Sequence, residues 1–125
     1  MQKEQFEYIL KKQLHKCEDM LSIKNLEYSQ DGDRLHNFHI AAEMLNIKPR
    51  AALAGMMAKH TVSVYDLCQE PVLASMEVWE EKITDHINYL ILLRAAVQEE
   101  MDQQEILAFD HKVEDALTAI EHPTS

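Results

Sequence analysis

The scarcity of helix-breaking residues is the feature that most constrains the fold of this chain. Its 125 residues include only two glycines and three prolines. The rest is rich in Leu, Ala, Glu, Lys, Gln and Met, side chains that lose little rotamer freedom in a helix. A chain of this length is normally one domain with a real core. We therefore expect a single all-α domain over residues 1–121, followed by a frayed tail at 122–125.

Helix boundaries follow from local signals. Pro49 suits a first helical turn, Ser75 is a reasonable N-cap, and Asp102 and Glu105 have the spacing of a capping box. Apolar residues recur at three- and four-residue spacing between these points. The helices that we expect cover about residues 2–24, 33–45, 49–69, 75–100 and 102–121.

Short connections between antiparallel helices predict a five-helix bundle. The helices over about 49–69 and 75–100 should form its central pair, because the second of them is the most apolar in the chain. The first and last helices each carry one apolar stripe, which serves either for packing or as a dimer seam. We expect a homo-oligomer, most simply a dimer.

The charge of the chain bears on its partners. The formal net charge is −10, from 22 acidic against 12 basic residues, which repels polyanions and disfavours nucleic acid as a partner. A local cluster of cations can still attract a small phosphate ligand, because short-range fields dominate within a Debye length of about 10 Å.

Three further features predict a cytoplasmic protein. Cys17 and Cys68 have apolar neighbours, which predicts that both are buried thiols of a protein in a reducing compartment. No apolar run reaches the roughly 20 residues that span a bilayer, so we expect no membrane partner. The N-terminus lacks a signal-peptide core. For a phage-encoded chain, the compartment would be the host cytoplasm.

Polar side chains interrupt the most apolar helix at Glu81, Asp85 and Asn88, which share one side of it. Buried carboxylates and amides need partners. The preceding helix offers Lys59, Ser63 and Asp66 at similar spacing. One interpretation is a cleft that holds a cation and a phosphate-bearing ligand, with the carboxylates as oxygen ligands for Mg²⁺. The alternative is that Asp85 pairs with Lys59 for structural reasons alone.

A second group of candidate residues lies at a loop-to-helix start, where free backbone N–H groups can bind anions. Its members are Tyr28, Asp33, Arg34 and Asn37. Tyr89, next to Asn88, either stacks on a base or packs in the core. The seven histidines are scattered, and we expect them to be surface or core residues rather than a dedicated metal site.

Three segments together resemble a known group of proteins: "YSQDGDRLHNFHIAAEML", "GMMAKHTVSVYDL" and "WEEKITDHINYLILL". The chain resembles small phage and prophage proteins related to the nucleotide-modification-associated domains. These are in turn similar to the MazG-type all-α nucleotide pyrophosphohydrolases. The resemblance spans about residues 28–97 and leaves the outer helices uncovered.

The resemblance implies a nucleotide pocket and a possible Mg²⁺-dependent hydrolase. MazG-type enzymes hold Mg²⁺ with Glu-Glu-x-x-Glu on one helix and Glu-x-x-Asp on the next. Glu81 and Asp85 would be the second pair, here at Glu-x-x-x-Asp spacing, and Asp66 would complete the metal ligands. In place of the paired glutamates stand Lys59, His60, Ser63 and Asp66. Lys59 would then neutralise phosphate while a metal-bound water attacks the α–β linkage.

Three functions therefore stay open. The first is a nucleotide-handling protein, either a MazG-like (d)NTP pyrophosphohydrolase or a relative that only binds. The second is a sponge that sequesters a nucleotide signal in anti-phage defence. The third is a helical adaptor that binds protein through the stripes of the outer helices.

Overall fold

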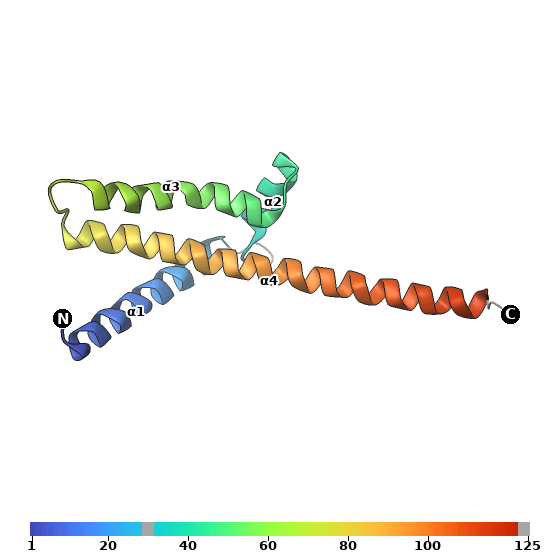
Figure 1. Cartoon of the computed structure of the whole chain (residues 1–125). Coiled ribbons are helices and arrows are strands. Elements are labelled where there is room, and N and C mark those ends of the chain that lie inside the picture. Colours follow the sequence, from blue (N-terminus) through green and yellow to red (C-terminus); the bar gives the residue numbers. More distant parts are fainter. Residues whose placement is uncertain (29–31, 123–125) are drawn as a thin grey trace.

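The computed structural model confirms an all-α chain (Figure 1). It describes residues 1–28 and 32–122, except for the side chains of 25–28. These described residues form four helices, so the expected count of five is wrong. The helices are α1 (Lys3–Tyr28), α2 (His36–Leu45), α3 (Pro49–Gln69) and α4 (Met76–Glu121).

The starts of α3 and α4 confirm two local signals. Pro49 occupies the first position of α3. Ser75 is the N-cap of α4, and its Oγ accepts a hydrogen bond from the backbone N–H of Val78 at 3.4 Å. Helix α2 begins later than Asp33, because the Asp33 carboxylate instead accepts the N–H of Leu35 at 2.9 Å in the preceding turn.

The expected break between residues 100 and 102 does not exist. Helix α4 runs for 46 residues without interruption. The side chain of Asp102 does not act as a cap but accepts a hydrogen bond from Gln98 Nε2 at 3.0 Å, one turn earlier in the same helix. No glycine or proline lies between residues 72 and 122, so nothing in the backbone ends the helix there.

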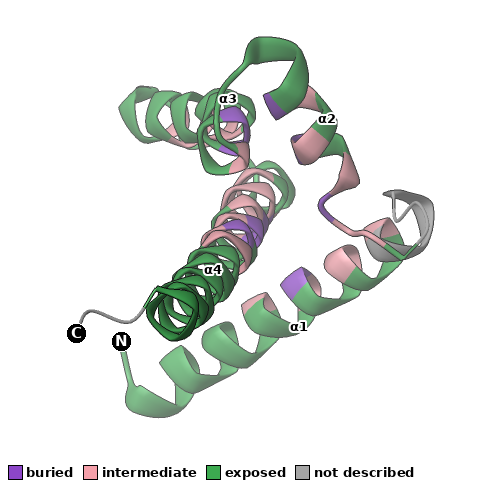
Figure 2. Cartoon of the chain, turned by 90° about the vertical axis from the view of Figure 1, so that its right-hand side faces the viewer, coloured by how far each residue is buried: buried purple, intermediate pink, exposed green. Residues whose placement is uncertain are grey.

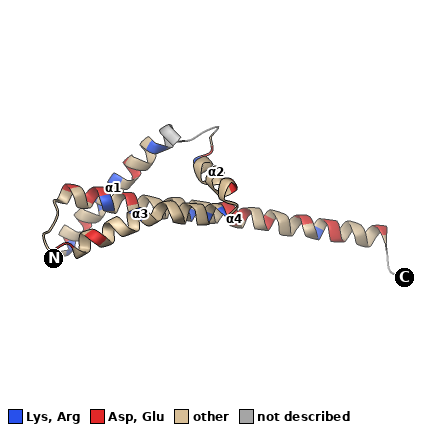
Figure 3. Ribbon diagram, turned by 90° about the horizontal axis from the view of Figure 1, so that it is seen from above, with Lys and Arg blue, Asp and Glu red and all other residues tan. Residues whose placement is uncertain are grey.

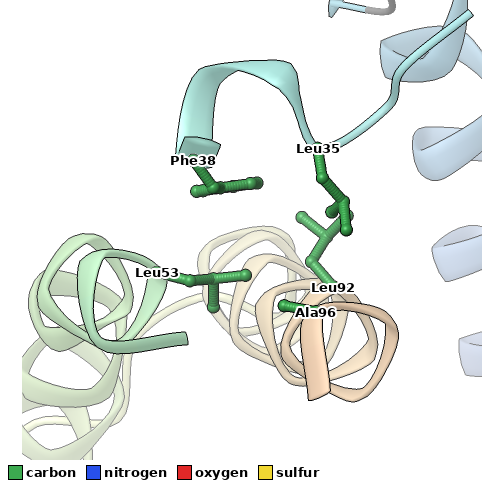
Figure 4. Packing of buried hydrophobic residues seen from close by; sticks show 5 residues of the cluster. All are labelled: Leu35, Phe38, Leu53, Leu92 and Ala96. Carbon is green, nitrogen blue, oxygen red and sulfur yellow. The ribbon is translucent and has the colours of Figure 1, made fainter. Parts of the chain in front are cut away.

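The core lies where α2, α3 and the middle of α4 meet (Figure 4). It consists of Leu35, Phe38, Leu53, Leu92 and Ala96. Helix α3 packs along the first half of α4, and α2 packs across the start of α3. The second half of α4 extends away from the other helices, and every residue from 101 to 122 is exposed (Figures 1 and 2). Only the first half of α4 therefore takes part in the helix bundle.

Helix α1 crosses the N-terminal half of α4 obliquely (Figure 1). Gln13 Nε2 donates to Thr84 Oγ1 at 2.9 Å, and Lys16 Nζ lies 2.9 Å from Glu80 Oε2.

Cys17 is buried at this crossing, whereas Cys68 on α3 is exposed and its expected burial is wrong. The first half of the expected α1 stripe is also exposed, because α1 covers α4 over only part of its length. Its exposed members are Phe6, Ile9, Leu10 and Leu14.

Two remaining expectations concern the whole chain. In the part that the structure describes, no helix is both long enough and apolar enough to cross a membrane. The frayed tail expected at 122–125 lies outside the described residues, except for His122.

Candidate ligand-binding pocket

A cavity of about 340 Å³ lies between the end of α1, the start of α2 and the middles of α3 and α4. We call it the cationic pocket, because three of its lining side chains are positively charged. Its wall is formed by Lys24, Arg34, Asn37, Phe38, Met56, Lys59, His60, Tyr89 and Leu92. Five of these nine were candidate ligand-binding residues: Arg34, Asn37, Lys59, His60 and Tyr89.

The three cations come from three different segments. Lys24 lies on α1, Arg34 in the turn before α2, and Lys59 on α3. Within the described residues, none of them has a carboxylate oxygen within 4.0 Å. In a chain with a formal charge of −10, three cations that have no acidic partner among the described side chains form a local positive field around one cavity.

Aromatic rings line the wall beside the cations. The rings of His60 and Tyr89 lie with their centroids 4.5 Å apart and are inclined at 33°. Phe38 meets Tyr89 edge to face, with centroids 6.4 Å apart. The ring of Tyr89 is therefore held from two sides by α2 and α3. Its orientation is fixed by packing before any ligand enters.

Asp85 lies beside His60. His60 Nδ1 lies 4.0 Å from Asp85 Oδ2, and both side chains are largely buried. Burial lowers the pKa of His60, the charge of Asp85 opposes this, and Lys59, Lys24 and Lys82 lower it further. The imidazole is therefore neutral near pH 7. Asp85 therefore lies beside a neutral ring, at a distance too long for a hydrogen bond. Among the described residues it forms no ion pair with Lys59, the partner considered in the structural alternative.

Asn88 lies one turn beyond Thr84 on the buried side of α4 and is not part of the cavity wall. It is 5% exposed. Neither its Nδ2 nor its Oδ1 has a hydrogen-bond partner among the described residues. Asn88 thus carries a desolvation cost that no described contact offsets.

The other candidate residues lie outside the cavity wall. Asp33 binds His39, with Asp33 Oδ2 at 2.9 Å from His39 Nδ1, and the second ring nitrogen of His39 contacts Glu99. This cluster, the His39 clasp, ties the turn before α2 to α4. Ser63 is half-buried on α3. The side chain of Tyr28 lies outside the described residues.

The predicted magnesium ligands Asp66, Glu81 and Asp85 are not gathered at one point. Asp66 on α3 and Glu81 on α4 are exposed, and Asp85 lies against His60. Among the residues that the structure describes, no three His, Cys, Asp or Glu side chains come together as a metal-binding group. The magnesium ligand set stays a prediction from the sequence.

Four wall residues were not among the candidates: Lys24, Phe38, Met56 and Leu92. Phe38 belongs to the core and Met56 is an apolar residue of α3, so both line the cavity at the edge of the core. Lys24 lies near the end of α1, and its place in the pocket depends on how α1 crosses α4. No local pattern in the sequence signals that crossing.

Comparisons with known proteins add no relative to this description. No protein-family model matches the chain, and neither curated proteins nor solved structures yielded a match.

Proposed function

We propose that this protein binds a small phosphate-bearing ligand of the nucleotide class in the cationic pocket. The observation that carries the proposal is the convergence of Lys24, Arg34 and Lys59 on one cavity, without an acidic partner in the described structure. A cation that has no acidic partner among the described residues favours an anion from solution. Arg34 can donate two parallel hydrogen bonds to a phosphate, and lysine side chains bind phosphate as point charges.

The shape and chemistry of the wall support a nucleotide over inorganic phosphate alone. The volume of about 340 Å³ lies in the range of small-molecule sites. The wall also contains apolar and aromatic surface from Phe38, Met56 and Tyr89, next to the amide of Asn37. A ligand with a charged end and a flat, partly apolar end would satisfy both parts of the wall.

The resemblance to MazG-type enzymes is the reason for choosing nucleotides as probes. Hydrolysis is a separate step from binding, and in that family it requires Mg²⁺ held by carboxylates. Glu81 and Asp85 share one side of α4. Asp85 lies beside His60, and His60 lines the pocket. Binding is the function that the pocket supports best, and pyrophosphohydrolysis is the activity to be tested on the same ligand.

The test is a thermal-shift screen of the full chain with nucleoside triphosphates, monophosphates and cyclic dinucleotides, each with and without Mg²⁺. Because a ligand that binds only the folded state stabilises it, at least one nucleotide should raise Tm in a concentration-dependent way. The corresponding uncharged nucleoside should produce a smaller shift. Chromatography of the recovered ligand then separates a binder from a hydrolase.

The outcomes are distinct. A nucleotide that is recovered intact indicates binding or sequestration. A monophosphate and pyrophosphate that appear only with Mg²⁺, and disappear in Asp85→Ala, indicate hydrolysis. If no nucleotide raises Tm while the free nucleoside does, the role assigned to the cations is wrong. If neither raises Tm, the pocket has no nucleotide function.

A further inference from the structure

The turn that brings Arg34 to the cationic pocket is fixed by the residues on either side of it. Leu35 belongs to the core and is 7% exposed. Asp33 closes the turn with two hydrogen bonds: its Oδ1 accepts the N–H of Leu35 at 2.9 Å, and its backbone carbonyl accepts the N–H of His36 at 3.3 Å. The placement of Arg34 therefore depends on how firmly Asp33 is held.

The His39 clasp connects this turn to α4. His39 Nδ1 lies 2.9 Å from Asp33 Oδ2, and His39 Nε2 contacts Glu99 Oε1. The imidazole thus lies between two carboxylates, one in the turn and one on another helix. Figure 3 shows acidic residues on both α2 and α4 where the two helices approach each other. The clasp is therefore a polar link between α4 and the residue that precedes Arg34.

Only a protonated imidazole can satisfy both carboxylates. An ionised carboxylate accepts hydrogen bonds but donates none, and both ring nitrogens donate only in the charged form of histidine. The neutral ring has a single N–H, so it sets a lone pair against one of the two carboxylates. Loss of the proton from His39 therefore breaks one contact of the clasp.

The loss of either contact loosens the hold on Arg34. Without Glu99, His39 no longer links the turn to α4. Without His39, the Asp33 carboxylate loses its cation and can bind the guanidinium of Arg34 instead, since carboxylate–guanidinium pairs are strong. In the described structure Asp33 is engaged by Leu35 and His39, and it forms no ion pair with Arg34. The clasp thus keeps Arg34 available to an anion from solution.

The charged groups that contact His39 or share a cavity with it are acidic in the described part of the chain. They are Asp33 in the turn, Glu99 on α4 and Glu43 on α2. At the start of α3, the uncharged Pro49 lines this cavity, whereas Lys48 and Arg50 line a neighbouring one. Burial lowers the pKa of His39, but the two carboxylates of the clasp outweigh burial and raise the pKa. His39 therefore holds its proton to a higher pH than an ordinary histidine.

We propose that His39 is a positioning residue for Arg34, and that a phosphate-bearing ligand binds the cationic pocket more tightly while the His39 clasp is protonated. This inference rests on the proposed function, because the affinity in question is that of the pocket. His39 is not in the pocket wall, so it acts through Arg34 and not by contact with the ligand. Affinity therefore falls as pH rises through the titration of His39.

The test is calorimetric titration of the full chain with ATP at pH 6.0 and pH 8.5. The Kd of His39→Gln, divided by the Kd of the wild type at the same pH, cancels the titration of ATP and of His60. Because glutamine has no charge to lose, this ratio should be about 5 at pH 6.0 and close to 1 at pH 8.5. A ratio that is the same at both pH values would overturn the proposal.

A double-variant cycle shows whether His39 acts through Arg34. Arg34→Gln should weaken ATP binding at both pH values, and adding His39→Gln to it should cause no further loss at pH 6.0. His111→Gln removes an exposed histidine from the far half of α4 and should match the wild type. A full His39→Gln effect in the Arg34→Gln background would mean a direct effect of charge and would overturn the positioning role.

Nuclear magnetic resonance without ligand distinguishes a failure of this proposal from a failure of the proposed function. The α-carbon chemical shifts of Arg34 and Leu35 report the conformation of the turn and should change with the midpoint of the His39 titration. In His39→Gln they should stay constant. Shifts that do not follow His39 would overturn the positioning role even if ATP binds. Shifts that follow His39 while ATP binds at neither pH would support the positioning role and place the failure in the proposed function.

Discussion

At the residue scale, three polar groups decide how the site and its surroundings behave. Asp85 lies against the neutral ring of His60, Asn88 is buried without a described partner, and His39 is clasped between two carboxylates. The sequence predicted that Asp85 and Asn88, polar groups in an apolar helix, need partners, but neither has a described hydrogen bond. The structure adds His39 on α2, which has two carboxylate partners. Their mutational effects should differ accordingly.

Replacing Asn88 with leucine should increase the free energy of unfolding. Because both polar atoms of its amide are buried without a described hydrogen bond, Asn88→Leu removes a desolvation cost while keeping a similar volume. The free energy of unfolding in urea should rise by about 1 kcal/mol. A loss of similar size would mean that the amide has a partner in the folded protein.

The His39 clasp should stabilise the fold mainly at acidic pH. Burial lowers the pKa of His39, but the hydrogen bonds and charges of Glu99 and Asp33 outweigh it and the pKa is raised. A raised pKa contributes stability that is fully present below the unfolded value of 6.5 and is lost as pH rises through the folded value. His39→Gln should therefore cost up to about 1 kcal/mol at pH 5.5 and clearly less at pH 8.5.

Urea unfolding at the two pH values measures this difference, and Glu99→Gln should reproduce its direction because it removes one of the two carboxylates. The comparison of variant with wild type at each pH cancels other titrating groups, including His60, whose lowered pKa acts in the opposite direction. A cost for His39→Gln that is the same at both pH values would show that the ring contributes packing rather than charge.

At the element scale, local signals placed most helix starts and ends correctly and failed at the start expected at residue 102. Pro49 and Ser75 act through the geometry of one turn, so the sequence alone was sufficient to place them. The capping-box spacing of Asp102 and Glu105 is equally local, but a cap forms only where the chain has left the helix. With no glycine or proline nearby, the helix continued and Asp102 bonded to Gln98 instead.

A matched pair of alanine variants tests whether α4 begins at Ser75 and continues through residue 102. Ser75→Ala removes a true N-cap and should lower the free energy of unfolding by about 1 kcal/mol. Asp102→Ala removes a residue in the middle of a continuous helix and should change it by less than about 0.5 kcal/mol. Urea titrations followed by circular dichroism measure both. Equal costs for the two variants would indicate that a helix does begin at residue 102.

At the scale of the whole molecule, the sequence predicted more of the pocket than of the arrangement around it. Arg34, Asn37, Lys59, His60 and Tyr89 were selected because polar and aromatic groups stood out in their local context, and the fold brings them to one cavity. The contribution of α1 was not predictable in this way. Whether a helix stripe packs within the chain depends on crossing angles that no local spacing encodes, so the exposure of both outer stripes was seen only in the structure.

The molecule combines a small core, a cationic pocket at the edge of that core and a helix half that no other described helix covers. The pocket is built from four helices and the turn before α2, so its chemistry depends on the fold rather than on any one segment. The cations in its wall are the part of this arrangement that an ordinary helical scaffold would not require. Their role in binding is the central claim.

The most direct measurement is calorimetric titration of the full chain with the nucleotide that gives the largest thermal shift. Lys59→Gln, which removes one wall cation, should weaken binding by about 10-fold or more. Lys112→Gln removes an equal charge from the projecting half of α4 and should leave Kd unchanged. Equal affinities for Lys59→Gln and the wild type, or no measurable binding by the wild type, would contradict the account.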